Sequence, residues 1–292
     1  MTYSQGTIIK GIGGFYYVKT SDGIVECKPK GLFRKKKISP LAGDEVTLEF
    51  GDDTYTISEI AKRKNFFLRP PIANVDIFFI IVSTLQPVPS TLVIDKLAAI
   101  AVDKGAVPII VITKTDLKGA EFLYECYSKS GIQIINAYDE NGEVSQVFKE
   151  MLKGKLSVLC GNSGVGKSTL LNKMLPSAER ETAQISKKLG RGKHTTREVE
   201  IFEAFGGRIA DTPGFASLEN ENINFICKEN LQYAFSDIEK YIPECKYTGC
   251  SHTCENGCAV IKAVNDGEIT QSRYKSYLTM YEKASETKDW QV

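Results

Sequence analysis

The residues with the clearest chemical signature form the run GNSGVGKST, which follows an apolar stretch at 156–160. Gly161, Gly166, Lys167 and Ser168 fill the pattern G-x4-G-K-S. Between a strand and a helix, such a loop wraps phosphates with backbone N–H groups, while its lysine adds positive charge and its serine hydroxyl binds Mg2+. The sequence therefore predicts a nucleoside triphosphate site with Mg2+. The predicted site consists of Gly161, Asn162, Ser163, Gly164, Val165, Gly166, Lys167, Ser168 and Thr169.

A second element selects the base. Thr113, Lys114, Thr115 and Asp116 close the apolar run 107–113 and are similar to the N-K-x-D element of GTPases. A carboxylate at Asp116 can accept two hydrogen bonds from guanine N1 and N2, whereas adenine would leave that charge unpaired. Thr113 stands where the element has Asn, and so lacks an amide that can brace the loop. We expect GTP and GDP as ligands.

A third element is the D-x-x-G run from Asp211 to Gly214. This spacing places a carboxylate near Mg2+ and a glycine N–H near the γ-phosphate. The polar loop GRGKHTTRE precedes it, where a GTPase carries the threonine of switch I that ligates Mg2+. Thr195 and Thr196 are both candidates, and we prefer Thr196. Ser168 and Thr196 are therefore the predicted magnesium ligands.

The residue that orients the attacking water must differ from that of many GTPases. Phe215 follows Gly214, where those enzymes place a glutamine, and its ring forms no hydrogen bond with water. His194, one of only two histidines, lies in the predicted switch loop, where an imidazole of near-neutral pKa can act on water. The alternative reading is a solvent-exposed loop histidine. The predicted catalytic residues are His194, Lys167 and Thr196, with a slow intrinsic rate that a partner accelerates.

The order of these motifs is unusual. An ordinary GTPase presents the phosphate loop, the switch threonine, D-x-x-G and then N-K-x-D. In this chain Asp116 precedes Lys167, which precedes Thr196 and Asp211. The sequence thus predicts a circularly permuted GTPase domain, an arrangement that compact domains tolerate because their termini often lie close together.

The elements that position these residues fall into three predicted domains: 1–68, 69–218 and 219–292. The first reads as a small β-barrel, with an OB-type barrel as one option. Its expected strands are 7–10, 14–19, 23–28, 45–50 and 55–60. The basic run Arg34 to Lys37, beside Lys28 and Lys30, is either a solvated loop or a contact for nucleic-acid phosphates.

The second domain alternates strands and helices, which indicates a parallel α/β fold of the P-loop GTPase type. We expect strands at 75–83, 107–113, 133–137, 156–160, 199–204 and 207–210, and helices at 91–104, 121–130, 144–152 and 167–175. The third domain is predicted to be mainly helical and ends in a helix near 270–285.

The third domain also contains a candidate metal site. Cys245, Cys250, His252 and Cys258 form the pattern Cys-x4-Cys-x-His-x5-Cys. Three thiolates and one imidazole complete the tetrahedral coordination of Zn2+ and leave no open position, so we expect one structural zinc ion. Cys254 is an alternative to His252 as the fourth ligand.

Composition limits the class of protein. The chain has 292 residues, of which 42% are hydrophobic and 25% charged, and its formal net charge is +1. Attraction to nucleic acid must therefore come from local basic clusters. We find no stretch typical of a signal peptide or a membrane span, and accordingly expect a cytoplasmic location without membrane contact. Nothing in the sequence demands more than a monomer.

The combination of a basic barrel, permuted motifs and the cysteine and histidine spacing resembles the RsgA (YjeQ/YloQ) family of ribosome-biogenesis GTPases. The resemblance spans nearly the whole chain. It implies an OB-fold, a permuted GTPase domain and a zinc domain that act late in maturation of the small ribosomal subunit. It also implies binding to the small subunit and its rRNA, which stimulates GTP hydrolysis, and help in releasing an assembly factor.

The resemblance further assigns the water-positioning function to His194. Asn136 and Ala137 depart from the Ser-Ala that the family usually shows after this strand, which leaves the last base-contacting loop open. Two other classes of function were weighed. A nucleic-acid-binding module with an inactive nucleotide site conflicts with the intact Lys167 and Asp211. A P-loop kinase would leave Asp116 unexplained.

Overall fold

The computed structural model describes residues 2–51, 54–68, 70–117, 119–175, 199–211 and 226–286. The chain divides into two compact units. The first contains the described residues of 1–76, 146–159 and 168–218, and the second those of 77–145, 160–167 and 219–292. Among the described residues, no helix is both long and apolar enough to cross a lipid bilayer.

The first unit begins with a closed barrel of five strands. The strands are β1 (Thr2–Ile12), β2 (Phe15–Thr20), β3 (Gly23–Pro29), β4 (Glu45–Gly51) and β5 (Thr54–Ile60). Their order is β1-β2-β3-β5-β4, and pairing of β1 with β4 closes the barrel. Only the β3–β5 pair of the barrel is parallel. Closure of five strands in this order confirms the OB-type barrel.

Alternation along the strands explains the barrel core. On β4, Val46 and Leu48 are buried and point inward, while Glu45 is exposed and Thr47 and Glu49 are only partly buried. The buried set consists of Ile8, Val18, Cys27, Phe33, Val46, Leu48 and Ile57. Period-two burial, which is clearest on β3 and β4, is the pattern that a barrel wall requires.

One expectation for the barrel needs correction. Arg34 and Lys35 do not belong to a loop, because they form the last turn of helix α1 (Gly31–Lys35), and Lys36 and Lys37 follow it. The helix is fixed to the barrel by Phe33, which is buried in the core. Cations at a helix C-terminus are favoured by its dipole. The basic cluster therefore sits on an ordered helix end.

The first unit also contains the strands that carry the phosphate loop and the D-x-x-G aspartate. Strands β11 (Leu156–Cys160) and β13 (Gly207–Asp211) are parallel, and β12 (Glu200–Ala204) pairs antiparallel with β13. The remaining elements are β6 (Phe66–Leu68), β7 (Pro71–Ala73), α4 (Gln146–Leu152) and α5 (Lys167–Met174). These bounds agree with the expected elements to within two residues, apart from β6 and β7, which were not expected.

The second unit is built on three parallel strands in the order β10-β9-β8. They are β8 (Ile77–Ser83), β9 (Val107–Thr113) and β10 (Gln133–Asn136), with helices α2 (Thr91–Asp103) and α3 (Glu121–Tyr127) between them. Every residue of β8 is buried, as expected for a parallel strand that is covered on both faces. The predicted α/β alternation is confirmed.

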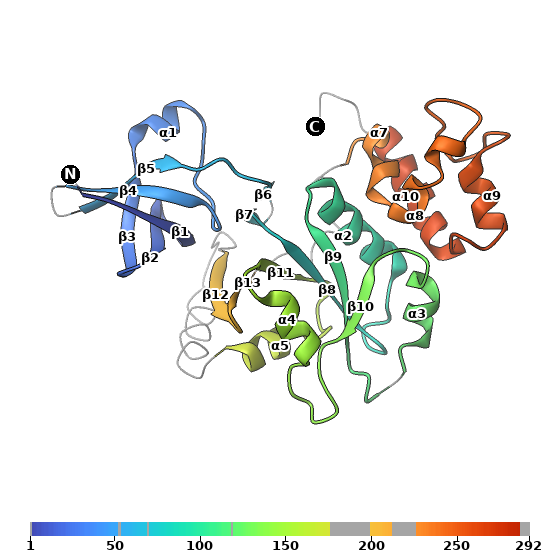
Figure 1. Ribbon diagram of the computed structural model, residues 1–292, viewed down its shortest axis with the longest axis horizontal. Helices are drawn as coiled ribbons and strands as arrows, with labels where there is room; N and C mark the ends of the chain where they lie inside the picture. Colours follow the sequence, from blue (N-terminus) through green and yellow to red (C-terminus); the bar gives the residue numbers. More distant parts are fainter. Residues whose placement is uncertain are drawn as a thin grey trace. The chain divides into compact units, whose positions relative to one another are not determined.

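The C-terminal part of the second unit is a group of helices, short except for the last (Figure 1). Its described elements are α7 (Lys228–Leu231), η2 (Gln232–Ala234), α8 (Ser236–Glu239), η3 (Ile242–Glu244), α9 (Ala259–Asn265) and α10 (Gln271–Glu286). Helix α10 packs against α2, the first helix of the α/β part. The predicted mainly helical C-terminal region is thus confirmed.

Candidate functional site

The phosphate loop leaves strand β11 at Gly161 and enters helix α5 at Lys167. Gly161 has a φ of +130°, and a Cβ atom there would lie 2.3 Å from the carbonyl oxygen of Ile81. Gly164 and Gly166 also have positive φ angles of +80° and +102°. Only glycine combines this backbone path with so close an approach, so the loop is shaped by its glycines.

Lys167 closes the loop on itself. Its Nζ donates hydrogen bonds to the carbonyl oxygens of Gly161 and Asn162, both at 2.6 Å. Ser168 and Thr169, in the first turn of α5, are exposed. A half-buried ammonium beside a helix N-terminus favours an anion such as a polyphosphate.

The predicted base-reading element, Thr113 to Asp116, is attached to this loop. Thr113, at the end of β9, is 2% exposed, and its Oγ1 lies 2.6 Å from the carbonyl oxygen of Val165 and 3.2 Å from that of Val82. Because one hydroxyl donates one hydrogen, the shorter contact with Val165 is the bond. Thr113 therefore braces the phosphate loop, a function that we expected the missing asparagine amide to perform.

Lys114 makes the second attachment. It has a left-handed φ of +59°, and its Nζ donates to the carbonyl oxygens of Gly164, at 3.0 Å, and Gln86. Its own carbonyl oxygen accepts a hydrogen bond from Thr84 Oγ1 at 2.7 Å. With Lys114 held in this way, Asp116 two residues later is exposed and open to a ligand.

The loop after the neighbouring strand β10 is also ordered. The backbone N–H of Ala137 donates to the carbonyl oxygen of Ile112 at 2.8 Å, and Ser145 Oγ donates to the carbonyl oxygen of Asn136 at 2.7 Å. These bonds keep the segment beside the strand that ends in Thr113. The departure at Asn136 and Ala137 does not disturb the edge of the sheet.

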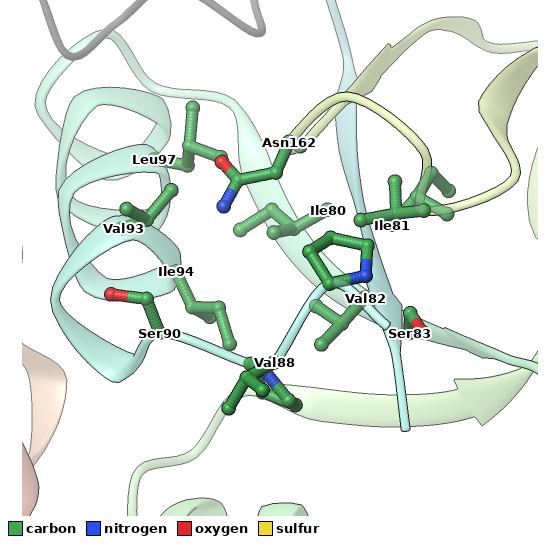
Figure 2. A pocket seen from close by; sticks show the side chains of 14 residues that line it. Ile80, Ile81, Val82, Ser83, Val88, Ser90, Val93, Ile94, Leu97 and Asn162 are labelled. Atoms are coloured by element: carbon green, nitrogen blue, oxygen red, sulfur yellow. The ribbon is translucent and has the colours of Figure 1, made fainter. Parts of the chain in front are cut away.

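A small pocket behind the phosphate loop has a different character. It is lined by apolar side chains of β8 and α2 together with Asn162, and Figure 2 shows the Asn162 side chain directed toward Val93 and Leu97. No charged residue lines this pocket. Polyphosphate needs cationic or N–H donors, so this pocket is not where we place the nucleotide.

Other predicted site residues lie elsewhere in the chain. Asp211 is the last residue of β13, in the first unit, and is half-buried. His194, Thr195, Thr196 and Gly214 lie outside the described residues. Their assignments to catalysis and to Mg2+ therefore stay predictions.

The candidate metal site is brought together by the fold. Ligand atoms of Cys245, Cys250, His252 and Cys258 all lie within 4.8 Å of one another. Nδ1 of His252 lies 3.6 Å from Cys245 Sγ and 3.4 Å from Cys258 Sγ, and these two sulfur atoms are 3.9 Å apart. A zinc ion with about 2.3 Å bonds to sulfur has tetrahedral edges of about 3.8 Å, so the donor set fits this ion. Cys254 is exposed and outside the cluster, which favours His252 as the fourth ligand.

Burial tunes the protonation of the cluster. It raises the pKa of the Cys250 thiol to about 12 and lowers the pKa of His252. Burial thus favours the protonated thiol of Cys250 and the neutral imidazole of His252. A metal ion binds such a site by displacing thiol protons.

Several residues that support the cluster were missed in the sequence. Gln232 Oε1 lies 2.9 Å from Nε2 of His252, which directs Nδ1 toward the thiols. The carboxylate of Glu255 accepts hydrogen bonds from Ser251, Thr253 and the backbone N–H of Cys254. No local sequence pattern identifies Gln232 as a partner of His252, because the two residues are twenty positions apart in the chain.

A glycine-shaped phosphate loop joined to a T-K-x-D element on a parallel sheet defines the class as P-loop GTPases, here with the motifs in permuted order. Two family models match the chain: the RsgA N-terminal domain at residues 5–57 and the RsgA GTPase at residues 60–221.

Individual relatives agree. The small ribosomal subunit biogenesis GTPase RsgA of Halalkalibacterium halodurans is 42% identical over 288 residues, covering 96% of both chains. The protein of the same name from Bacillus anthracis is 39% identical over 97% of this chain and 98% of its own.

Two solved structures are also similar. YjeQ from Thermotoga maritima superposes with a TM-score of 0.81 at 30% identity, covering 98% of this chain and all of that one. YloQ, described as a circularly permuted GTPase, has a TM-score of 0.79 at 34% identity, covering 98% and 96%. The chain belongs to the RsgA family of GTPases, and the predicted family and GTP-hydrolysing class are thereby confirmed.

Proposed function

We propose that this GTPase hydrolyses GTP to GDP and phosphate as a step in late maturation of the small ribosomal subunit. The observation that carries the nucleotide part is the attachment of the base-reading element to the phosphate loop through Thr113 and Lys114. The names of the relatives, small ribosomal subunit biogenesis GTPases, support the cellular part.

Within that function we assign the nucleotide contacts residue by residue. Lys167 neutralises the β- and γ-phosphates, and Asp116 pairs with guanine N1 and N2. Ser168 and Thr196 would hold Mg2+, and a bound Mg2+ would supply positive charge to stabilise the phosphates. The remaining contacts come from residues 113–115, from the loop 161–169, and from Asp211 and Gly214.

We further assign His194 to orienting the attacking water. The support is chemical: Phe215 occupies the position of the usual glutamine, and an imidazole near neutral pKa can hold a water molecule. His194→Ala should therefore leave GTP affinity unchanged and lower kcat. A normal kcat in this variant would remove His194 from the mechanism.

The flanking regions are proposed to contact the subunit. The basic end of helix α1 on the barrel suits rRNA phosphates, and we infer that rRNA and the small subunit are the partners that stimulate hydrolysis.

We propose Zn2+ as the resident ion of the Cys245, Cys250, His252 and Cys258 cluster, with a structural function. We also propose a cytoplasmic monomer that helps an assembly factor leave the subunit.

The test is steady-state GTP hydrolysis by the purified chain with and without small ribosomal subunits, with large subunits and ATP as controls. Stimulation by small subunits alone is the expected result. Tight GTP binding without any stimulation would support the proposed nucleotide site, but it would mean that a different partner stimulates hydrolysis. Equal hydrolysis of ATP would contradict the assignment of Asp116.

A further inference from the structure

Helix α10 carries a buried arginine that joins three helices of the second unit. Arg273 is 2% exposed. Its Nη1 donates to Asp95 on α2 at 2.7 Å, and its Nε and Nη2 donate to Asp237 on α8 at 3.0 and 2.7 Å. The guanidinium carbon lies 4.5 Å from the ring centroid of Phe235. Removing Arg273 would leave two buried carboxylates without a cation, so this side chain links the three helices.

The same helix supports the metal cluster. Tyr274 donates its hydroxyl hydrogen to the carbonyl oxygen of His252 at 2.8 Å, and Tyr277 donates to that of Ser251 at 2.9 Å. The ring of Tyr277 also meets Phe235 edge to face, with centroids 5.6 Å apart. Arg273 and Tyr277 are four residues apart and share one face of α10. This face therefore contacts both the metal loop and the ion cluster.

The N-terminal end of helix α2, which carries Asp95, is also connected to the base-reading element. The helix begins at Thr91, directly after the segment 84–90. In that segment Gln86 accepts a hydrogen bond from Lys114 Nζ, and Thr84 donates one to the carbonyl oxygen of Lys114. A shift of α2 would consequently move two groups that hold Lys114 in place.

Helix α3, on the other side of the base-reading element, is attached to the C-terminal region as well. This helix begins at Glu121, shortly after Asp116. Three hydrogen bonds join the end of α3 and the turn after it to the C-terminal region: Thr270 Oγ1 to Cys126 O at 2.8 Å, Ser236 Oγ to Ser130 O at 2.7 Å, and Lys129 Nζ to Gly267 O at 2.8 Å. The region that contains the metal cluster thus contacts both helices that flank the base-reading element.

We propose that metal binding at the cysteine and histidine cluster is thermodynamically coupled to guanine-nucleotide binding, with Arg273 as the positioning residue that connects them. The metal ion orders the loop whose carbonyl groups accept from Tyr274 and Tyr277. Arg273 connects α10 to α2 through its bond with Asp95. Helix α2 in turn positions the segment 84–90, which contacts Lys114. The inference rests on the proposed function only in taking GDP as the ligand.

Coupling of this kind is reciprocal, and this gives a test with two independent readouts. In the full chain with Mg2+, the dissociation constant of a fluorescent GDP analogue is measured with zinc bound and after chelation. Zinc affinity is then measured by chelator competition with and without GDP. Chelation should weaken GDP binding about fivefold or more, and GDP should tighten zinc binding by the same factor.

Substitutions locate the connection. Asp95→Asn leaves Arg273 paired with Asp237, so the variant should fold and bind zinc while its GDP affinity no longer depends on zinc. Tyr277→Phe removes only the hydroxyl contact with the metal loop and should reduce the coupling factor. Lys228→Ala, at an exposed site on α7, is the matched control and should keep the full factor.

The outcomes separate two failures. If GDP binds equally well with and without zinc, the coupling is absent and the proposed function stands. If neither form binds GDP, both proposals fall. Retention of the full coupling factor in Asp95→Asn and Tyr277→Phe would overturn the assignment to Arg273.

Discussion

The N-terminal barrel and the C-terminal region of this GTPase are held together in different ways. The barrel closes five strands through backbone hydrogen bonds around a buried apolar set that includes Leu48 and Ile57. The C-terminal region contains helices of only four residues, such as α7 and α8, which are too short to persist alone. Its described interior contains buried apolar side chains such as Phe235 and Val260, and in addition the ion pairs of Arg273, tyrosine hydroxyl bonds and the cysteine and histidine cluster.

The difference shows two routes to a small stable fold. The barrel is closed by continuous strand pairing around one apolar core. The C-terminal region, in contrast, joins short helices and the loop 245–258 through buried paired charges and a cluster whose donors suit a metal ion. We therefore expect the barrel to be insensitive to chelation. The C-terminal region should lose its structure when the metal ion is removed.

The largest effect should come from the metal ligands. Cys258→Ser removes one donor from a four-donor cluster, and metal binding in such sites contributes about 10 kcal/mol or more to folding. Amide hydrogen exchange should accelerate across residues 226–286 and stay unchanged across residues 2–51. Cys254→Ser, an exposed cysteine outside the cluster, is the control and should change neither. Equal acceleration in the barrel would contradict the comparison.

A core substitution should produce the opposite pattern. Leu48 is fully buried in the barrel, and Leu48→Ala should cost about 2–5 kcal/mol through lost transfer free energy and a cavity. Chemical denaturation should show an earlier barrel transition with unchanged zinc affinity. Phe50→Ala, at a site 39% exposed on the same strand, should cost much less. Loss of zinc binding in Leu48→Ala would mean that the two regions depend on one another.

A smaller effect should follow from the residue that orients His252. Gln232→Leu removes the acceptor for its Nε2–H group and should lower zinc affinity roughly 10- to 100-fold, as for other residues that orient metal ligands. Gln232→Glu keeps an acceptor and should retain most of the affinity. Chelator competition measures both, and equal affinities would show that Gln232 does not orient the ligand.

The smallest effect should come from an exposed ion pair beside the barrel. Lys19 Nζ lies 2.6 Å from Glu203, with side chains 43% and 57% exposed. Solvent screens such a pair, so Lys19→Ala should change the free energy of unfolding by less than about 1 kcal/mol. A larger decrease in the free energy of unfolding, measured by urea denaturation, would mean that ion pairs stabilise the barrel region as they stabilise the C-terminal region around Arg273.

Much of this arrangement could be predicted from the sequence. The barrel strands alternate with period two, β8 and β9 are short apolar runs, and the phosphate loop has a fixed spacing of glycines and lysine. The cysteine and histidine spacing likewise identified four residues that the fold brings together. Each of these signals lies within a short window of sequence.

What the sequence did not reveal depends on contacts between distant polar residues. Arg273 and Asp95 are 178 residues apart, and Gln232 is twenty residues from His252. The hydroxyl of Thr113 replaces the expected amide through a bond with Val165, which only the folded loop brings near. Helix α1 was missed because its five residues are too few to show a helical period.

The central claim is that Asp116 selects guanine. The most direct measurement compares kcat/KM for GTP and xanthosine triphosphate in the wild type and in Asp116→Asn. Xanthine presents a carbonyl oxygen where guanine has an amino group. The side-chain amide of the variant can donate a hydrogen bond to that oxygen, which a carboxylate cannot do. We predict that the variant loses activity with GTP and gains activity with xanthosine triphosphate. An unchanged preference for GTP would contradict the claim.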